Sequence, residues 1–130
     1  LAEEALKEHP GVPVFVHEFI ARMDLAYAAA DVVVSRAGAG SISEFCAAGK
    51  ACIFVPSPNV AEDHQTHNAL ALVKENAGWM VTDKDAPVSL MEKALELIFN
   101  DSQRQRLSAN ILKLSRPHAA EQIASLLLEL

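Results

Sequence analysis

The chain has 130 residues, 51% of them hydrophobic, which is enough for one domain with a buried core. Its 11 basic and 17 acidic side chains give a net charge of −6, which argues against nucleic acid as a partner and against unaided adhesion to anionic lipid. The 2 cysteines lack a C-x-x-C spacing, so we predict no disulfide framework or zinc site and a reducing, cytoplasmic compartment. No apolar run reaches the roughly 20 residues of a membrane span, so we predict no spanning helix.

The chain begins with Leu1 rather than methionine, and its first nine residues, 1–9, already have a helical pattern. We therefore expect a piece of a longer protein, with residues 1–130 forming a single domain.

Strands and helices are predicted to alternate through the first two thirds of the chain. Runs rich in β-branched or aromatic residues predict four strands, at Val12 to His17, Asp31 to Ser35, Ala51 to Pro56 and Trp79 to Thr82. Helical periodicity in the intervals predicts helices at Met23 to Ala30, Ser41 to Ala48 and Gln65 to Asn76. A C-cap is expected after the last of these helices, at Ala77-Gly78. Apolar strands joined through helices predict a parallel sheet covered on both faces, which is a doubly wound α/β fold.

After Asp83 the pattern is helical only. The predicted helices are Ser89 to Asn100, Ser102 to Ser115 and His118 to Leu130, with a fresh N-cap around Asn100 and prolines suited to helix starts at Pro87 and Pro117. Helices therefore complete the expected domain.

The segment Ser35 to Glu44 is the first candidate binding loop. Small residues lead from an apolar strand into a helix, whose first backbone N–H groups and dipole favour an anion, so we expect a phosphate there. Gly38-Ala39-Gly40 forms a G-x-G, but Ser43 stands where a dinucleotide fingerprint needs its third glycine. The P-loop and G-x-S-x-G motifs are missing too, which argues against the common NAD, ATP and α/β-hydrolase sites.

Glu44 has two interpretations that its spacing leaves open. Ser41 to Glu44 fits a capping box, S-x-x-E, in which both side chains satisfy N–H groups of their own helix. Alternatively, the Glu44 carboxylate accepts hydrogen bonds from a pair of hydroxyls on a ligand.

The second candidate loop runs from Pro56 to Asn68. It follows the next predicted strand, so it belongs at the same edge of the sheet as the glycine loop, where open α/β folds bind ligands. Its polar side chains suit a sugar, because carboxylates accept and amides both donate and accept hydrogen bonds: Asp63, His64, Gln65 and Asn68. The alternatives are an N-cap for Asp63 and a hydrogen bond to the neighbouring loop for Asn68. His64 and His67 lack a third ligand, so no metal site is predicted.

Taken in order, these segments resemble the carboxy-terminal half of the two-Rossmann (GT-B) glycosyltransferases, and within them the MurG-type N-acetylglucosaminyltransferases. The segments that carry the resemblance are Phe19-Ile20, Met23, Ala26-Tyr27-Ala28, Ala30 to Gly38, Ser43-Glu44, Ala47-Ala48-Gly49, Phe54-Val55-Pro56, Asp63-His64-Gln65 and Asn68-Ala69.

The resemblance implies a site for UDP-N-acetylglucosamine. It places the backbone of Ile20 at the uracil ring and the Glu44 carboxylate at the ribose hydroxyls. Gln65 matches a glutamine that contacts the sugar hydroxyls, Asn68 an asparagine beside it, and His64 stands where the family has another glutamine. The residues facing ribose and pyrophosphate would be Ala39, Gly40, Ser41, Ile42 and Ser43.

The implied reaction is inverting transfer of N-acetylglucosamine to undecaprenyl-pyrophosphoryl-muramoyl-pentapeptide in peptidoglycan synthesis, without a metal or other cofactor. The family carries its phosphate loop, acceptor site and general base ahead of the segment that matches Leu1, so no catalytic residue is expected here. The full-length protein would be peripheral on the cytoplasmic face of the inner membrane, and an exposed apolar edge would let this piece self-associate. Two alternatives remain: a GT-B UDP-sugar transferase with another acceptor, and a non-catalytic α/β interaction module.

Overall fold

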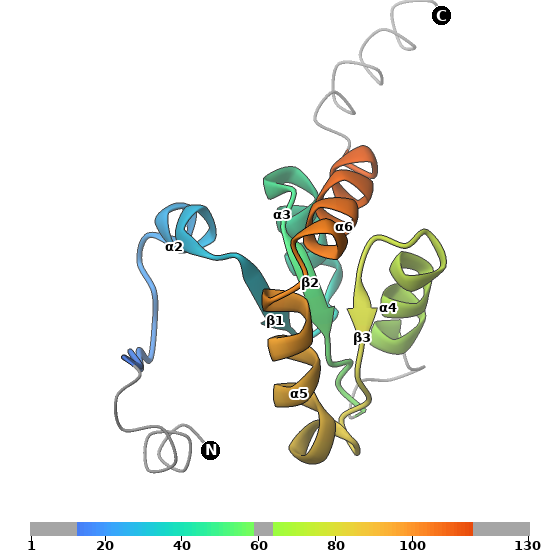
Figure 1. Ribbon diagram of the computed structural model, residues 1–130, viewed down its shortest axis with the longest axis horizontal. Coiled ribbons are helices and arrows are strands. Elements are labelled where there is room, and N and C mark those ends of the chain that lie inside the picture. Colours follow the sequence, from blue (N-terminus) through green and yellow to red (C-terminus); the bar gives the residue numbers. More distant parts are fainter. Residues whose placement is uncertain (1–12, 59–63, 116–130) are drawn as a thin grey trace, which may run out of the picture.

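A computed structural model describes residues 13–58 and 64–115 (Figure 1). In these residues three strands form one sheet in the order β1-β2-β3, and both pairings are parallel. The strands are β1 (Val32–Ser35), β2 (Ala51–Phe54) and β3 (Trp79–Met80). Each lies inside a predicted strand, so the parallel α/β prediction is confirmed for this part of the chain.

The described residues form five helices, and each overlaps a predicted one. They are α2 (Met23–Ala29), α3 (Ala39–Ala48), α4 (His64–Lys74), α5 (Ala86–Ile98) and α6 (Asp101–Lys113). The helices expected at residues 1–9 and 118–130 lie outside the described residues. No helix of the described part is long and apolar enough to cross a membrane.

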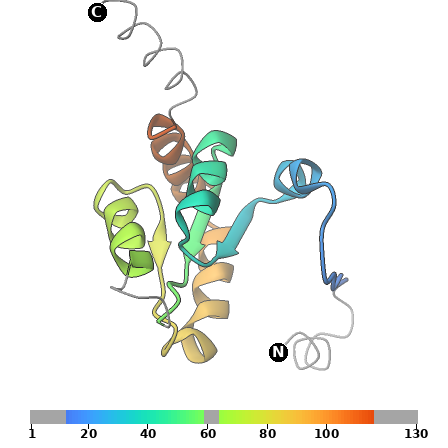
Figure 2. The ribbon, with the colours of Figure 1, turned by 180° about the vertical axis from the view of Figure 1, so that it is seen from behind.

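Strand β2 is buried on both faces, because its alternate side chains enter two separate cores. Cys52 and Phe54 pack with residues of α3 and α4, whereas Ile53 packs with Leu97 of α5 and Leu107 of α6. Figure 1 shows α5 and α6 in front of the sheet, and Figure 2, seen from behind, shows α3 in front of it. The helices therefore cover both faces, as the continuous apolar pattern of Ala51 to Val55 predicts.

The strand predicted at Val12 to His17 is wrong for the residues that the structure describes. Residues 13–22 form no strand there, and their large side chains are exposed, Phe15 to 81% and Phe19 to 83%. A strand needs a hydrogen-bonding neighbour, and within the described residues none pairs with this segment. A composition rich in β-branched and aromatic residues was therefore insufficient by itself to make this segment a strand.

The C-cap predicted at Ala77-Gly78 is also wrong. Helix α4 ends at Lys74, and the left-handed residue that follows it is Asn76, with φ 53°. Gly78 serves close packing instead, since a Cβ built there would lie 2.7 Å from Cε2 of the Phe54 ring. The predicted N-cap at Asn100 is confirmed, because its side chain accepts a hydrogen bond from the N–H of Gln103 at 3.1 Å.

Candidate functional site

The carboxyl ends of the three parallel strands meet at one edge of the sheet, and Arg36 connects them. It follows β1 directly, and its Nη1 donates to the backbone oxygens of Val55 (3.3 Å) and Pro56 (3.4 Å) after β2. The same nitrogen lies 2.6 Å from Oδ1 of Asp83, which follows β3. Because Arg36 and Asp83 are half exposed, this ion pair is worth about 0–1 kcal/mol, and its main effect is to hold the three strand ends together.

The two candidate loops are neighbours, and Gln65 joins them. Its Oε1 accepts hydrogen bonds from the N–H of Ala37 at 3.2 Å and from the N–H of Ser57 at 2.8 Å. One turn further along α4, Nδ2 of Asn68 donates to the carbonyl oxygen of Ala37 at 3.0 Å. The alternative interpretation of Asn68, a hydrogen bond to the neighbouring loop, is therefore confirmed.

Helix α3 begins without a side-chain cap. Gly38 is its N-cap residue, and no side chain there accepts from the first turn. The capping box proposed for Ser41 and Glu44 is wrong, because the helix starts two residues earlier and Ser41 already lies inside it. Within α3, the Ser43 hydroxyl donates to the carbonyl of Ala39 at 3.1 Å. The start of α3 thus presents backbone N–H groups and the positive end of the helix dipole at the strand-end edge.

The Glu44 carboxylate lies on the side of α3 that faces α2. Its Oε2 accepts a hydrogen bond of 2.6 Å from the hydroxyl of Tyr27. That hydrogen bond, with smaller contributions from burial and from the Glu44 charge, raises the pKa of Tyr27 to about 12. Both residues line an open cavity of about 590 Å³ between the two helices, together with Met23 and Lys50.

The remaining predicted site residues lie around these groups. Ile20 is 40% exposed and precedes α2, the helix that carries Tyr27. His64 is exposed at the first position of α4, and Asp63 lies outside the described residues. Gln65 contacts the loop just before α3, whereas Glu44 lies further along that helix, and Gln65 is not among the lining residues of the Glu44 cavity. The remaining residues lie in the first turns of α3, with Ile42 packed against the core and the others exposed: Ala39, Gly40, Ser41 and Ser43.

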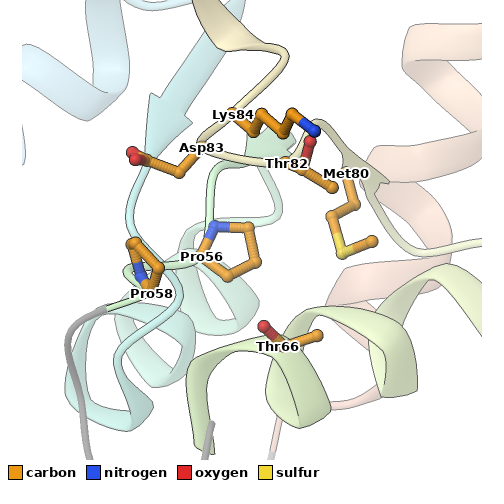
Figure 3. Close-up of a pocket in the computed structure, with 7 residues that line it drawn as sticks. All are labelled: Pro56, Pro58, Thr66, Met80, Thr82, Asp83 and Lys84. Atoms are coloured by element: carbon orange, nitrogen blue, oxygen red, sulfur yellow. The ribbon is translucent and has the colours of Figure 1, made fainter.

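A second cavity, of about 330 Å³, opens at the same edge between the ends of β2 and β3 and the first turn of α4 (Figure 3). Figure 3 shows Thr66, on α4, across the cavity from Pro56 and Met80. The other lining residues are Pro58, Thr82, Asp83 and Lys84. The lining combines three apolar side chains with four polar or charged ones, which suits part of a small organic ligand.

Sequence reasoning assigned no role to Arg36, Tyr27 or Asp83. Tyr27 carried a signal, since it is the only tyrosine of the chain and, apart from Asp24 in the first turn, the other residues of its helix are small or apolar. Arg36 and Asp83 carried little, because 47 residues separate them and only the parallel sheet brings them together. Within residues 13–58 and 64–115, no group of three or more His, Cys, Asp or Glu side chains is placed to hold a metal ion.

Comparison with known proteins agrees with this architecture. The profile of the glycosyltransferase family 28 C-terminal domain matches residues 2–123. The UDP-N-acetylglucosamine--N-acetylmuramyl-(pentapeptide) pyrophosphoryl-undecaprenol N-acetylglucosamine transferase of Cytophaga hutchinsonii is 55% identical over 127 residues, which cover 98% of this chain and 34% of that protein. The enzyme of the same name from Parabacteroides distasonis is 53% identical over 122 residues, covering 94% of this chain and 33% of that protein.

A solved structure shows the same fold. The crystal structure of MurG from Acinetobacter baumannii superposes with a TM-score of 0.79 at 26% sequence identity, over 99% of this chain and 38% of that chain. The present chain spans about a third of the length of the curated relatives it matches. With its parallel sheet, its strand-end loops and a family match over nearly all of its length, the chain belongs to the glycosyltransferase family 28 C-terminal domain family.

Proposed function

We propose that this chain is the donor-binding part of an inverting glycosyltransferase that moves N-acetylglucosamine from UDP-N-acetylglucosamine to undecaprenyl-pyrophosphoryl-muramoyl-pentapeptide. The names of relatives that are 55% and 53% identical supply the reaction and the substrates. The observation in this chain that carries the proposal is the uncapped start of α3 at the strand-end edge, with Gln65 at the loop before it and Glu44 further along the helix.

The proposed placement of the donor combines this geometry with the resemblance to the GT-B glycosyltransferases. The first turns of α3, from Ala39 to Ser43, lie beside the ribose and the pyrophosphate, whose charge the N–H groups and the helix dipole stabilise. Glu44 accepts hydrogen bonds from the ribose hydroxyls, and the backbone at Ile20 meets the uracil ring.

The sugar lies toward the start of α4, near His64 and Gln65. Because Oε1 of Gln65 already serves two backbone N–H groups, Gln65 contacts a sugar hydroxyl through its Nε2 amide, as a donor. Asn68 acts on the donor indirectly. Its amide donates to the carbonyl oxygen of Ala37 and so holds the loop that precedes α3 in place.

In the transfer step, the acceptor hydroxyl attacks C1 of N-acetylglucosamine as the bond from C1 to the UDP oxygen breaks, and the configuration at C1 inverts. The hydroxyl proton goes to a general base that we place outside this chain. The contribution of this chain is to orient the donor and to stabilise the negative charge that develops on the departing UDP. We place the whole enzyme on the cytoplasmic face of the inner membrane, where its lipid-linked acceptor lies.

The test uses a protein of the relatives' full length that carries this chain in place of the matching third of the C. hutchinsonii enzyme, called here the full-length enzyme. Glu44→Ala removes charge-assisted hydrogen bonds worth about 1.5–3 kcal/mol, so the KM for UDP-N-acetylglucosamine rises by about tenfold to 150-fold. Glu92→Ala, which removes an exposed carboxylate from α5, is the matched control and leaves KM unchanged.

An unchanged KM in Glu44→Ala would overturn the ribose assignment. Activity only with an acceptor other than the lipid-linked muramoyl-peptide would point to a different UDP-sugar transferase. If the unsubstituted full-length enzyme bound no UDP in calorimetry, the chain would instead be an interaction module.

A further inference from the structure

Tyr27 and Glu44 form a contact between two helices that are separate in the sequence. The Tyr27 hydroxyl on α2 lies 2.6 Å from Oε2 of Glu44 on α3, 17 residues further along the chain. That distance is typical of a hydrogen bond from a hydroxyl to a charged carboxylate, which is stronger than a bond between neutral groups.

The core holds the tyrosine ring in place. Tyr27 is half-buried and packs against the core cluster of Phe45, whose ring meets it edge-on at 5.6 Å between centroids and 82° between planes. Phe45 is itself only 3% exposed and contacts the Phe54 ring. Lys50, just after the end of α3, donates from Nζ to the carbonyl oxygen of Ala30, just after the end of α2, at 3.1 Å. The Tyr27 hydroxyl therefore occupies a defined position relative to α3.

Glu44 has no such packing of its own. Its residue is exposed, and among the described residues Tyr27 is the one group that donates to its carboxylate. A glutamate on a helix surface samples several rotamers, and a ligand that binds it must bear the cost of ordering it. With Oε2 held by Tyr27, this cost is met before the ligand arrives, and Oε1 remains to accept from it.

We propose that Tyr27 is a positioning residue for donor binding, whose hydroxyl holds the Glu44 carboxylate in the orientation that receives the ribose hydroxyls. This inference rests on the proposed function, because it takes the ribose as the ligand of Glu44. Tyr27 does not touch the donor in this scheme and acts only through Glu44.

The protonation of the Tyr27 hydroxyl is compatible with this positioning role. Because the pKa of Tyr27 is raised to about 12, its hydroxyl keeps its proton and remains a donor throughout the neutral pH range. The Tyr27 oxygen therefore adds no negative charge beside Glu44 where the donor binds.

The first test compares two ligands in the full-length enzyme. Tyr27→Phe removes the hydroxyl and keeps the ring, so we expect the KM for UDP-N-acetylglucosamine and the Kd for UDP to rise about threefold to tenfold, with kcat within about twofold. The Kd for 2′,3′-dideoxy-UDP, which lacks the hydroxyls that Glu44 would bind, should not change. The matched variant Tyr27→Leu also removes the ring packing and should weaken both ligands.

The outcomes separate this inference from the proposed function. If Glu44→Ala weakens UDP but Tyr27→Phe does not, the positioning role of Tyr27 is overturned and the ribose assignment stands. If Tyr27→Phe weakens UDP and its dideoxy analogue equally, Tyr27 is merely structural and the inference is overturned. If Glu44→Ala leaves UDP binding unchanged, the ribose assignment itself fails.

A second test detects the hydrogen bond without any ligand. Tyr27 is the only tyrosine of this chain, so the tyrosinate absorbance of the chain reports on one group. With circular dichroism confirming the fold at each pH, we expect a titration midpoint near 12, and a midpoint shifted toward 10 in Glu44→Gln, which removes the charge. A midpoint near 10 in the unsubstituted folded chain would show that the pair is not formed and would overturn the inference.

Discussion

The amide oxygen of Gln65 accepts hydrogen bonds from two loops at once, and this double contact explains why a single residue matters for the edge of the sheet. Removing Gln65 would leave the N–H groups of Ala37 and Ser57 without their acceptor, at a cost of about 1–3 kcal/mol for each group that becomes buried and unpaired. The sequence predicted a polar residue at this place. It did not predict that the oxygen would be committed to the protein and only the amide nitrogen left for a ligand.

The two cysteines should be unreactive while the chain is folded. Cys46 and Cys52 are free and buried, and burial raises the pKa of both thiols, that of Cys52 to about 12. Since the thiolate is the reactive form, both should resist a thiol reagent at pH 8 in the folded chain and react at once in denaturant. Mass spectrometry after timed alkylation measures this. Fast modification of either cysteine in the folded chain would contradict it.

At the scale of helices and strands, the glycines show which positions local patterns could assign. Gly49 follows α3 with φ 63°, the left-handed conformation in which glycine carries no Cβ penalty. Gly78 looked like an equivalent helix end, but its role is to admit the Phe54 ring, which comes from β2 more than twenty residues earlier. The residues near a helix end determine where the helix stops. Whether a glycine is needed for close packing depends on which side chain the fold places against it.

Gly78→Ala should therefore destabilise the fold. The new Cβ would lie 2.7 Å from Cε2 of Phe54, which is fully buried and has no room to move, so we expect a loss of about 1–3 kcal/mol in the free energy of unfolding. The control is Gly40→Ala, where a Cβ meets nothing within 4 Å and lies in a helix, so stability should be unchanged or rise by up to about 1 kcal/mol. Urea unfolding followed by circular dichroism compares them. Equal midpoints for the two variants would contradict the packing argument.

At the scale of the whole molecule, the described part before β1 is joined to the rest through contacts of Tyr27 and Ala30, and most of its other side chains are exposed. Helix α2 has no buried residue, and Figures 1 and 2 both show it and the preceding segment to one side of the sheet. Within the described residues, β1 pairs only with β2, so one edge of β1 is open. An open strand edge beside exposed apolar side chains favours association with another chain.

This chain alone should therefore self-associate, and light scattering should give a mass above the 14.0 kDa of one copy. Placing lysines at two exposed apolar positions, Phe15→Lys with Phe19→Lys, should shift it toward the monomer. Val88→Lys with Phe99→Lys, at positions that are 86% and 83% exposed elsewhere on the surface, should not. A strictly monomeric unsubstituted chain at high concentration would count against this expectation.

The sequence by itself determined the alternation of strands and helices, the parallel α/β class, the N-cap at Asn100 and the place of both candidate loops after their strands. These features depend on periodicity and on neighbours a few residues apart, which the order of residues records directly. It could not assign the segment 13–17, because whether a β-rich run becomes a strand depends on a neighbouring strand.

Only the tertiary structure decided which groups meet. It joined Arg36 to Asp83, Gln65 to two backbone N–H groups and Tyr27 to Glu44, and it showed that Ser41 lies inside α3 rather than capping it. The physical reason is that a hydrogen bond depends on distances and angles between atoms, and the packing of the sheet and its helices sets these for residues that are far apart in the chain.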